Sequence, residues 1–274
     1  MRADVLEQEI AKRLEPVSDC ARFEARCLLE HYAHISLSDI YLQKEVEPHT
    51  AAIETAVQKR LSGIPLQYIL GKWEFMGNAF FVDENVLIPR PETELLCECL
   101  LDKIGQKSIV YDLCAGSGCI AVSVAKLTGA TVYAVEKYPH TMEVLKKNIA
   151  LHNLESVIPV LSDITEAPPC QLPQADVILS NPPYIERRIL PSLQTEVQKE
   201  PVAALDGGED GLNFYRAIAA NYVPMLKEGG YLAVEIGEGQ AAAVQTVFEM
   251  LQHTQTIADY NGIDRVMVFR KEQI

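Results

Sequence analysis

The run Asn181-Pro182-Pro183-Tyr184 combines two hydrogen-bond acceptors with a flat aromatic ring. Because proline has no backbone N–H, the two prolines stiffen the chain and leave acceptors, namely the Asn181 side-chain oxygen and the Pro182 carbonyl. Such a pair fits a planar –NH2 group, which has two hydrogens to donate, and the Tyr184 ring offers a face for stacking. An amide or aromatic amine nitrogen is a weak nucleophile, so holding its hydrogens and aligning its lone pair favours group transfer to it. The alternative is a proline-stiffened turn with an incidental tyrosine.

A second group of residues indicates a nucleoside. The run Cys114-Ala115-Gly116-Ser117-Gly118 follows an apolar stretch, and its glycines allow a ligand to approach the backbone closely. Glu136 lies twenty residues beyond Gly116, at the end of the next apolar stretch, where a carboxylate can accept hydrogen bonds from both ribose hydroxyls. Together these residues predict a cofactor that contains a nucleoside; a tight turn without a ligand is the alternative.

The glycines alone leave the identity of that cofactor open. Gly116, Gly118 and Ala121 also satisfy the dinucleotide fingerprint, so a nicotinamide-dependent dehydrogenase is an alternative. Asp112, just before the glycine-rich run, would repel a pyrophosphate but suits a cation. Because S-adenosylmethionine carries a sulfonium and an ammonium, this carboxylate favours methyl transfer.

Alternating strand and helix patterns after residue 91 must position these groups. The expected strands cover residues 108–113, 131–135, 157–161, 176–180 and 231–236, with a terminal pair at 254–260 and 266–270 around Asn261-Gly262. The expected helices cover residues 119–127, 139–152, 214–226 and 241–251. Such alternation predicts an α/β fold, a doubly wound and mostly parallel sheet with an antiparallel C-terminal strand. Ligands bind at the carboxyl ends of such strands, where both motifs fall.

The residues before this sheet predict a small helical bundle and a connection. The bundle covers residues 1–62, and its third helix is expected to begin after Pro48. Its expected inward-facing residues are Val5, Ile10 and Leu14 in the first helix and Phe23, Cys27, Leu28 and Leu29 in the second. Residues 63–90 are expected to form a linker with a β-hairpin that turns at Gly77-Asn78, and residues 91–274 form the α/β domain.

Charge and cysteine content narrow the classes of function. The 274 residues include 24 Lys and Arg against 38 Asp and Glu, a net charge of −14. Nucleic-acid binding requires neutralisation of phosphates, so this acidity argues against a non-specific duplex binder. Seven irregularly spaced cysteines, with no signal peptide or membrane-spanning apolar run, predict free thiols in a cytoplasmic compartment. The cysteine and histidine spacing does not match a zinc site, so no metal is expected.

Taken together, Asp112, Gly116, Gly118, Glu136 and the run at 181–184 resemble the class I S-adenosylmethionine-dependent amino-methyltransferases. Within that class the sequence is similar to the bacterial release-factor glutamine methyltransferases, the PrmC/HemK family. The runs that carry this likeness are Pro65-Leu-Gln-Tyr-Ile-Leu-Gly71, Pro89-Arg-Pro-Glu-Thr-Glu94 and Gly208-Glu-Asp-Gly-Leu212.

This resemblance covers nearly the whole chain and implies a specific reaction. The enzyme would have a seven-stranded class I methyltransferase sheet and would use S-adenosylmethionine to methylate the side-chain amide nitrogen, N5, of a glutamine. That glutamine would lie in the Gly-Gly-Gln motif of peptide chain release factors, the expected protein partners. The helical domain at residues 1–62 would recognise the release factor.

The resemblance also implies roles for individual residues. The cofactor-binding set would be Cys114, Ala115, Gly116, Ser117, Gly118, Glu136, Asp163, Ile164 and Asn181. In that set the 114–118 loop would hold the methionine portion, Glu136 the ribose, and Asp163 with Ile164 the adenine. The catalytic set would be Asn181, Pro182 and Tyr184, with Pro183 helping to shape the substrate slot. The family usually has glycine where this chain has Cys114, and a side chain there is expected to require a negative φ.

Other interpretations remain at this stage. An adenine N6-methyltransferase acting on nucleic acid would use the same four residues on another planar amine, but the acidic charge argues against it. The run from Pro89 to Glu94 is either a proline-guided helix start or one wall of the site. We expect Arg187 and Arg188 to be a solvated surface pair; the alternative is that they bind an acidic partner.

Overall fold

The computed structural model of this chain describes residues 1–47 and 50–272, so Pro48 lies outside the described residues. Contacts divide the chain into two compact units. The helical unit comprises Met1–Lys72 together with Gln194–Lys199, and the sheet unit comprises Trp73–Leu193 and the residues from Glu200 onward. Nothing in the sequence patterns predicts that Gln194–Lys199 groups with the helices.

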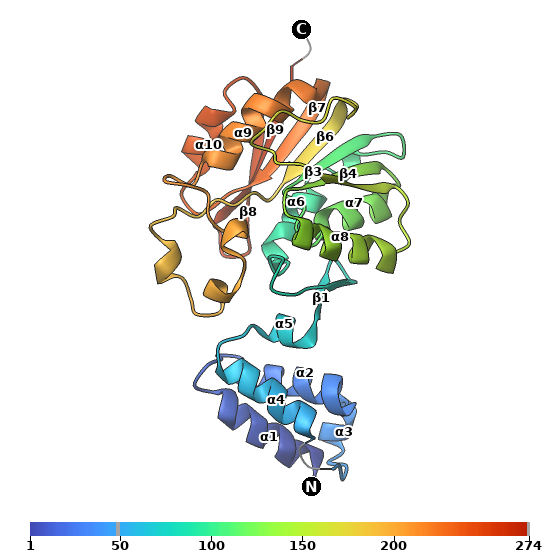
Figure 1. Ribbon diagram of the computed structural model, residues 1–274, viewed down its shortest axis with the longest axis vertical. Helices are drawn as coiled ribbons and strands as arrows, with labels where there is room; N and C mark the ends of the chain where they lie inside the picture. Colours follow the sequence, from blue (N-terminus) through green and yellow to red (C-terminus); the bar gives the residue numbers. More distant parts are fainter. Residues whose placement is uncertain (48–49, 273–274) are drawn as a thin grey trace. The chain divides into compact units, whose positions relative to one another are not determined.

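The helical unit is built from short helices, drawn in blue to cyan in Figure 1. They are α1 (Ala3–Leu14), α2 (Ala21–Ala33), α3 (Leu37–Tyr41), α4 (Ala51–Leu61) and α5 (Leu66–Leu70). Helix α1 buries one face through Leu6, Ile10 and Leu14. The expected place of Val5 on that face is wrong, since its side chain is 43% exposed and lies about 100° around the helix from Leu6. Phe23 on α2 is 53% exposed and was also wrongly expected to face the core.

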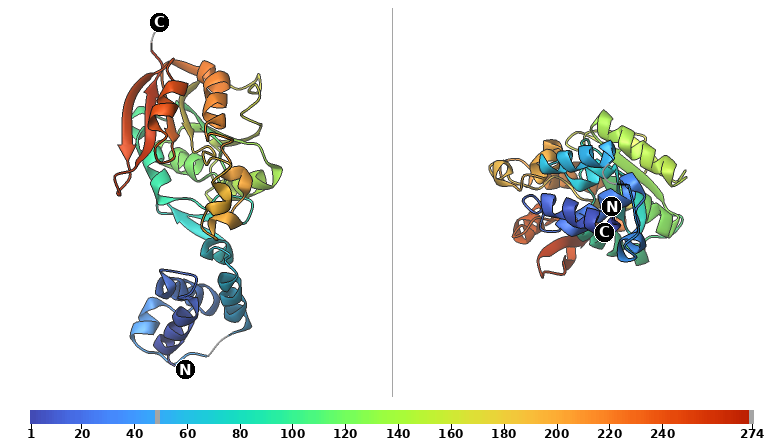
Figure 2. Two further views of the ribbon diagram at one scale, coloured as in Figure 1. Left: turned by 90° about the vertical axis from the view of Figure 1, so that its left-hand side faces the viewer. Right: turned by 90° about the horizontal axis from the view of Figure 1, so that it is seen from below.

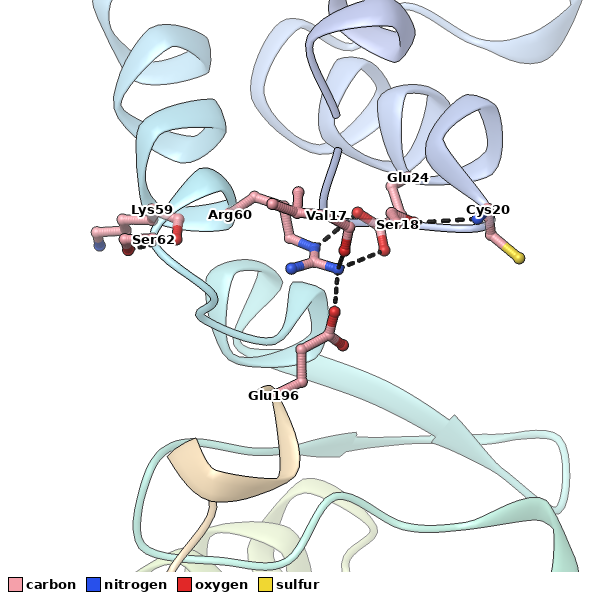
Figure 3. A network of polar contacts seen from close by, with 8 residues as sticks. All are labelled: Val17, Ser18, Cys20, Glu24, Lys59, Arg60, Ser62 and Glu196. Atoms are coloured by element: carbon pink, nitrogen blue, oxygen red, sulfur yellow. Dashed lines mark hydrogen bonds and ion pairs between the residues drawn. The ribbon is translucent and has the colours of Figure 1, made fainter. Parts of the chain in front are cut away.

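Arg60, near the end of α4, links several parts of the helical unit. Its side chain is 1% exposed; Nε donates to Glu24 Oε2 at 2.7 Å and Nη2 donates to the Val17 carbonyl at 3.0 Å. Figure 3 shows the same guanidinium meeting Glu196 of the Gln194–Lys199 segment. Because a buried guanidinium requires anionic partners, this contact explains why a segment so distant in sequence belongs to the helical unit.

A β-hairpin lies at the start of the sheet unit, which contains all of its residues except Lys72. Strand β1 (Lys72–Phe75) pairs with β2 (Asn78–Phe81). The turn residues are Met76 and Gly77, with φ of +48° and +68°, so the turn lies one residue before the expected Gly77-Asn78. Positive φ at both central residues is the type I′ geometry that matches the twist of paired strands. Asn78 instead begins β2 and donates from Nδ2 to the Met76 carbonyl at 2.7 Å.

The main sheet has seven strands in the order β5-β4-β3-β6-β7-β9-β8. They are β3 (Ile109–Leu113), β4 (Thr131–Glu136), β5 (Val157–Leu161), β6 (Ala175–Ser180), β7 (Leu226–Glu235), β8 (Gln252–Ala258) and β9 (Asp264–Arg270). Pairing is parallel from β5 to β7, whereas β9 is antiparallel to both β7 and β8. The predicted mostly parallel sheet with an antiparallel C-terminal strand is confirmed. That strand lies inside the edge, between β7 and β8, and both β8 and β9 are red in Figure 2.

Helices cover both faces of this sheet. Those that position the site are α6 (Glu94–Glu98), α7 (Cys119–Thr128), α8 (Pro139–Leu151), α9 (Asn213–Ala217) and α10 (Ala241–Val247). Successive side chains of a strand point to opposite faces. Accordingly, Val110 of β3 packs in one core with residues of α6, α7 and α8, whereas Tyr111 packs in a second core with residues of α9 and α10. Within the described ranges, no helix has the length and apolarity to cross a bilayer.

The helix expected at residues 214–226 is interrupted. Helix α9 ends at Ala217, a π-helical turn follows over Ile218–Tyr222, and a 3-10 turn over Val223–Met225 leads into β7. Pro224 lies in that last turn, and a proline removes a helical hydrogen bond and clashes with the preceding turn. The chain therefore leaves the helix sooner than its apolar pattern predicts.

Candidate active site

A cavity of about 910 Å³, counted with the solvent at its mouth, lies at the carboxyl ends of β3, β4 and β6. This is the edge at which open parallel sheets bind ligands. The expected site residues on its wall are Cys114, Ala115, Gly116, Ser117, Glu136, Asp163, Ile164, Asn181 and Pro183. The wall as described does not include three other expected residues, Gly118, Pro182 and Tyr184.

The loop after β3 turns through three residues with left-handed backbone geometry. The angle φ is +63° at Cys114, +56° at Gly116 and +80° at Gly118. The expectation of a negative φ at Cys114 is therefore wrong, and a non-glycine residue in this region costs about 1–2 kcal/mol. Gly118 is required on two grounds, because a Cβ there would also lie 2.2 Å from Leu145 Cδ1. These turns place the loop backbone on the cavity wall and start α7 at Cys119.

Two groups at this loop are held neutral by burial. Burial, with Glu136 and Asp112 nearby, raises the pKa of the Cys114 thiol well above its usual value, so the thiol is not a nucleophile. Burial also raises the pKa of Asp112 to about 8. Asp112 Oδ2 accepts from the Ala121 N–H at 3.0 Å, and Asp112 is not part of the cavity wall as described. This side chain therefore caps the start of α7, and its interpretation as a charge suited to a cationic ligand stays a prediction.

Glu136, at the end of β4, is one of two acidic residues on the cavity wall as described, together with Asp163. Its Oε2 accepts from the Gly116 N–H at 3.0 Å, and its Oε1 accepts from the N–H groups of Lys137 at 2.8 Å and Tyr138 at 2.9 Å. The residue is 6% exposed, and burial raises the pKa of its carboxyl despite these donors. Glu136 thus joins the glycine loop to the next strand and presents a carboxylate to the cavity.

Asp163 and Ile164, which follow β5, border the same cavity as Glu136. Asp163 Oδ2 lies 2.7 Å from Lys137 Nζ, and its Oδ1 accepts from the Thr165 N–H at 2.9 Å. Although partial burial acts to raise it, the pKa of Asp163 is lowered by Lys137 and by Thr165. Ile164 is buried, so this part of the wall combines a fixed carboxylate with an apolar surface.

Asn181 lies directly after β6, and its amide has a defined orientation. Asn181 Nδ2 donates to Thr93 Oγ1 at 3.1 Å, and Thr93 Oγ1 donates to Glu235 Oε2 at 2.6 Å. Since the amide nitrogen is engaged by Thr93, the amide oxygen lies on the other arm of the same side chain. The cavity wall therefore carries an asparagine whose amide nitrogen already donates to Thr93.

The other residues of the run after β6 have different surroundings. Pro183 is on the cavity wall with Asn181, and Pro182 is buried. Tyr184 donates from its hydroxyl to Glu235 Oε1 at 3.3 Å, and its carbonyl accepts from Gln240 Nε2 at 3.0 Å. Tyr184 is thus fixed at both ends.

The run from Pro89 to Glu94 contributes to the wall and also begins a helix. Pro89, Arg90 and Thr93 line the cavity, and a 3-10 turn at Pro91–Thr93 leads into α6. Arg90 forms an ion pair with the buried Glu200, whose Oε2 also accepts from the Ile88 N–H at 3.0 Å. Both interpretations of this run therefore apply.

Sequence reasoning missed the roles of Glu235 and Glu200. Glu235 is 2% exposed at the end of β7, within the run Tyr231-Leu-Ala-Val-Glu-Ile236. A single carboxylate in this otherwise apolar run of six residues was the available signal, because buried carboxylates are rare unless they have partners. Its partners come from separate parts of the sequence, so the pattern alone could not name them.

Comparisons with known proteins identify the relatives of this chain. Residues 6–71 match the PrmC N-terminal domain, and residues 92–204 match the TRM5/TYW2 methyltransferase domain. A release factor glutamine methyltransferase from Thermodesulfovibrio yellowstonii is 37% identical over 262 residues, which cover 91% of this chain and 92% of that protein. One from Geobacter sulfurreducens is 40% identical over 254 residues, covering 90% and 88%. The chain belongs to the release factor glutamine methyltransferase family. The family resemblance inferred from the motifs is confirmed.

The fold of this family member also resembles that of a solved methyltransferase. A methyltransferase from Pyrococcus furiosus aligns with a TM-score of 0.56 at 15% identity, over 82% of this chain and 100% of that chain. At this identity the likeness shows the fold alone, and it confirms the class I methyltransferase sheet.

Arg187 and Arg188 of this family member pair with nearby carboxylates. Arg187 Nε lies 2.9 Å from Asp206 Oδ2, and Arg188 Nε lies 2.6 Å from Glu186 Oε2. Both arginine side chains are mostly exposed, so water screens these ion pairs. Their local ion pairs agree with a solvated surface.

Proposed function

We propose that this chain transfers a methyl group from S-adenosylmethionine to the side-chain amide nitrogen, N5, of the glutamine in the Gly-Gly-Gln motif of a peptide chain release factor. The observation that carries the proposal is the orientation of Asn181. Its nitrogen is engaged by Thr93, which leaves its oxygen to accept from a substrate –NH2. Family membership supports the same substrate, because the relatives bear the name release factor glutamine methyltransferase.

The residues on the cavity wall fit the proposed cofactor. A Cβ at Gly116 would be 3.9 Å from its nearest neighbour, the Cys114 carbonyl oxygen, so the loop leaves open space beside its backbone. Glu136 presents acceptor oxygens suited to ribose hydroxyls, and Asp163 with the apolar Ile164 suits the amine and ring of adenine. These residues would hold S-adenosylmethionine, which supplies an electrophilic methyl group when bound.

Substrate positioning would fall to the run after β6. The Asn181 side-chain oxygen and the Pro182 carbonyl would each accept one hydrogen of the glutamine –NH2. Holding both hydrogens orients the nitrogen lone pair toward the incoming methyl group, and orientation of this kind lowers a barrier without a covalent intermediate. Pro183 would form the adjoining wall of the slot, and Tyr184 would fix the end of the run through its bonds to Glu235 and Gln240.

The helical unit would recognise the release factor. Its match to the PrmC N-terminal domain supports a role that is separate from cofactor binding. All seven cysteines are free thiols, which supports action in a reducing compartment such as the cytoplasm. The net charge of −14 supports a protein substrate over nucleic acid.

The test is to find the methylated atom. The full chain is incubated with isotope-labelled S-adenosylmethionine and a release factor, and the labelled peptide is mapped by mass spectrometry. We expect one methyl group on the Gly-Gly-Gln glutamine, and no label on a release factor in which alanine replaces that glutamine. Label on DNA or RNA, or on another residue of the release factor, would contradict the proposal.

A further inference from the structure

We propose that Glu235 and Thr93 are positioning residues that fix which end of the Asn181 amide faces the substrate. The inference rests on the proposed function, because it concerns how Asn181 presents an acceptor to a substrate –NH2. It adds two residues to that function: Thr93, which is hydrogen-bonded to Asn181, and Glu235, which is hydrogen-bonded to Thr93.

An asparagine amide has nearly the same shape in its two orientations but opposite hydrogen-bonding character. With its oxygen toward the substrate, Asn181 accepts a hydrogen from an –NH2 group. With its nitrogen toward the substrate, it would present a second donor to a donor, and the pair would repel. Correct presentation therefore requires something beneath Asn181 that distinguishes its nitrogen from its oxygen.

Thr93 makes that distinction through the direction of its hydroxyl. A hydroxyl has one hydrogen, and Thr93 gives it to Glu235 Oε2 over 2.6 Å. Toward Asn181 the Thr93 oxygen can then only accept, and Asn181 Nδ2 lies 3.1 Å from it. The flipped amide would place its oxygen against the Thr93 oxygen, with no hydrogen between them.

Glu235 in turn fixes the direction of the Thr93 hydroxyl. An ionised carboxylate only accepts hydrogen bonds, and the two Glu235 oxygens are used by Thr93 and by Tyr184, whose hydroxyl donates over 3.3 Å. The residue is 2% exposed, so water does not compete readily for these positions. The hydrogen bonds from Asn181 to Thr93 and from Thr93 to Glu235 thus favour one polarity, in which the Asn181 oxygen faces the cavity.

Protonation of Glu235 would remove that polarity. A neutral carboxyl can donate to Thr93, which then directs its own hydrogen toward Asn181 and tolerates the flipped amide. The titratable and charged groups that face Glu235 are Glu92, Cys119, Tyr184, Tyr215 and Arg265. Burial raises the pKa of Glu235 to about 7, against the hydrogen bonds from Thr93 and Tyr184 and the charge of Arg265. The ionised, orienting form is therefore lost as pH falls through about 7.

Thr93 offers a matched pair of substitutions for the test. Thr93→Val keeps the side-chain shape but removes the hydroxyl, and should lower kcat for methyl transfer to the release factor by about 10- to 100-fold. The dissociation constant of S-adenosylmethionine, measured by calorimetry, should stay within about threefold. Thr93→Ser restores the hydroxyl and should recover most of kcat. Thr128→Val, which removes a hydroxyl bound to the Val124 carbonyl away from the cavity, controls for the loss of any threonine hydrogen bond.

Glu235→Gln tests the pH dependence. In the native protein kcat should fall below pH 7, and this acid limb should disappear in Glu235→Gln, since the amide does not titrate. Equal losses in Thr93→Val and Thr93→Ser, full kcat in Thr93→Val, or a parallel loss of cofactor affinity would each overturn the positioning role. If the native enzyme left the release factor unmethylated, that result would instead contradict the proposed function.

A second measurement needs no turnover. The carboxyl carbon of Glu235 can be titrated by NMR in protein labelled with 13C-glutamate, with Glu235→Gln providing the assignment. Removing a donor to an ionised carboxylate disfavours the charged form, so Thr93→Val should raise the pKa of Glu235 while Thr93→Ser should not. An unchanged titration in Thr93→Val would refute the proposed chain of bonds whatever the substrate.

Discussion

Replacing Gly118 with alanine should destabilise the protein more than the same change at Gly116, two residues earlier in the loop. Both glycines have positive φ, so both substitutions incur a backbone cost of about 1–2 kcal/mol. Only at Gly118 does the new Cβ meet an obstacle, at 2.2 Å from Leu145 Cδ1, whereas at Gly116 the nearest atom is 3.9 Å away. Leu145 is fully buried, so its side chain cannot rotate into solvent to make room.

The steric contribution is what separates the two variants. Overpacking a filled core costs about 1–3 kcal/mol, so Gly118→Ala should lose about 2–5 kcal/mol of unfolding free energy and Gly116→Ala about 1–2 kcal/mol. Urea denaturation of the full chain, followed by circular dichroism, measures both losses. The loss measured for Gly116→Ala is the matched control, because this variant has the backbone strain without the steric obstacle.

A double variant isolates the contact with Leu145. Leu145→Ala alone should lose about 2–5 kcal/mol through the cavity it leaves, but it also removes the atom that obstructs the new Cβ. The loss in the double variant Gly118→Ala/Leu145→Ala should therefore be at least about 1 kcal/mol smaller than the sum of the two single losses. Equal losses at the two glycines, or strict additivity in the double variant, would refute the steric argument.

Four further predictions concern charged side chains. Glu136→Ala removes the acceptor for three backbone N–H groups and should weaken S-adenosylmethionine binding by about 10- to 100-fold in calorimetry. Arg60→Met leaves Glu24 without its buried partner and should cost about 3–5 kcal/mol in urea denaturation. Glu196→Gln should cost under about 1 kcal/mol, because that side chain is 40% exposed. Burial raises the pKa of Glu235 from 4.5 to about 7, so the folded state holds this proton more tightly than the unfolded state. The unfolding free energy should therefore be highest below pH 4.5 and should fall by roughly 3 kcal/mol as pH rises through 7. Glu235→Gln should flatten that dependence, measured as unfolding free energy at pH 5 and pH 8.

Local patterns in the sequence predicted most of the order of elements. The strands that end at Leu113, Glu136 and Ser180 are mostly apolar and have clear ends, as expected of parallel strands buried on both faces. Patterns of this kind carry no information on contacts between distant residues. The grouping of Gln194–Lys199 with the helices depends on Arg60, which is 136 residues before Glu196 in the chain. No periodicity within either segment encodes that contact.

The positions of the site motifs were predictable for a related reason. Motifs at the carboxyl ends of neighbouring parallel strands meet at one edge of the sheet, and the runs after β3 and β6 do so here. Backbone geometry and buried partners were less predictable. Cys114 has a positive φ although residues with a Cβ avoid it, because the turn between β3 and α7 dictates the conformation. Glu235 acquires its role only because β7 pairs with β6 beside Tyr184.

The arrangement around Asn181 explains how the proposed site would distinguish glutamine from similar side chains. Pro182 and Pro183 have no backbone N–H, while Asn181 Nδ2 and the Thr93 hydroxyl each donate a hydrogen within the protein, away from the Asn181 oxygen. What remains is a pair of acceptors, which an –NH2 group satisfies with two hydrogens. A hydroxyl has one hydrogen and would leave an acceptor unpaired, at a cost of about 1–3 kcal/mol. A carboxylate has none and would add charge repulsion, so a glutamate at the substrate position should be rejected more strongly than a serine. The buried Glu235 that enforces this pattern lowers stability at neutral pH, a cost that is understandable if selectivity for an amide is what it provides.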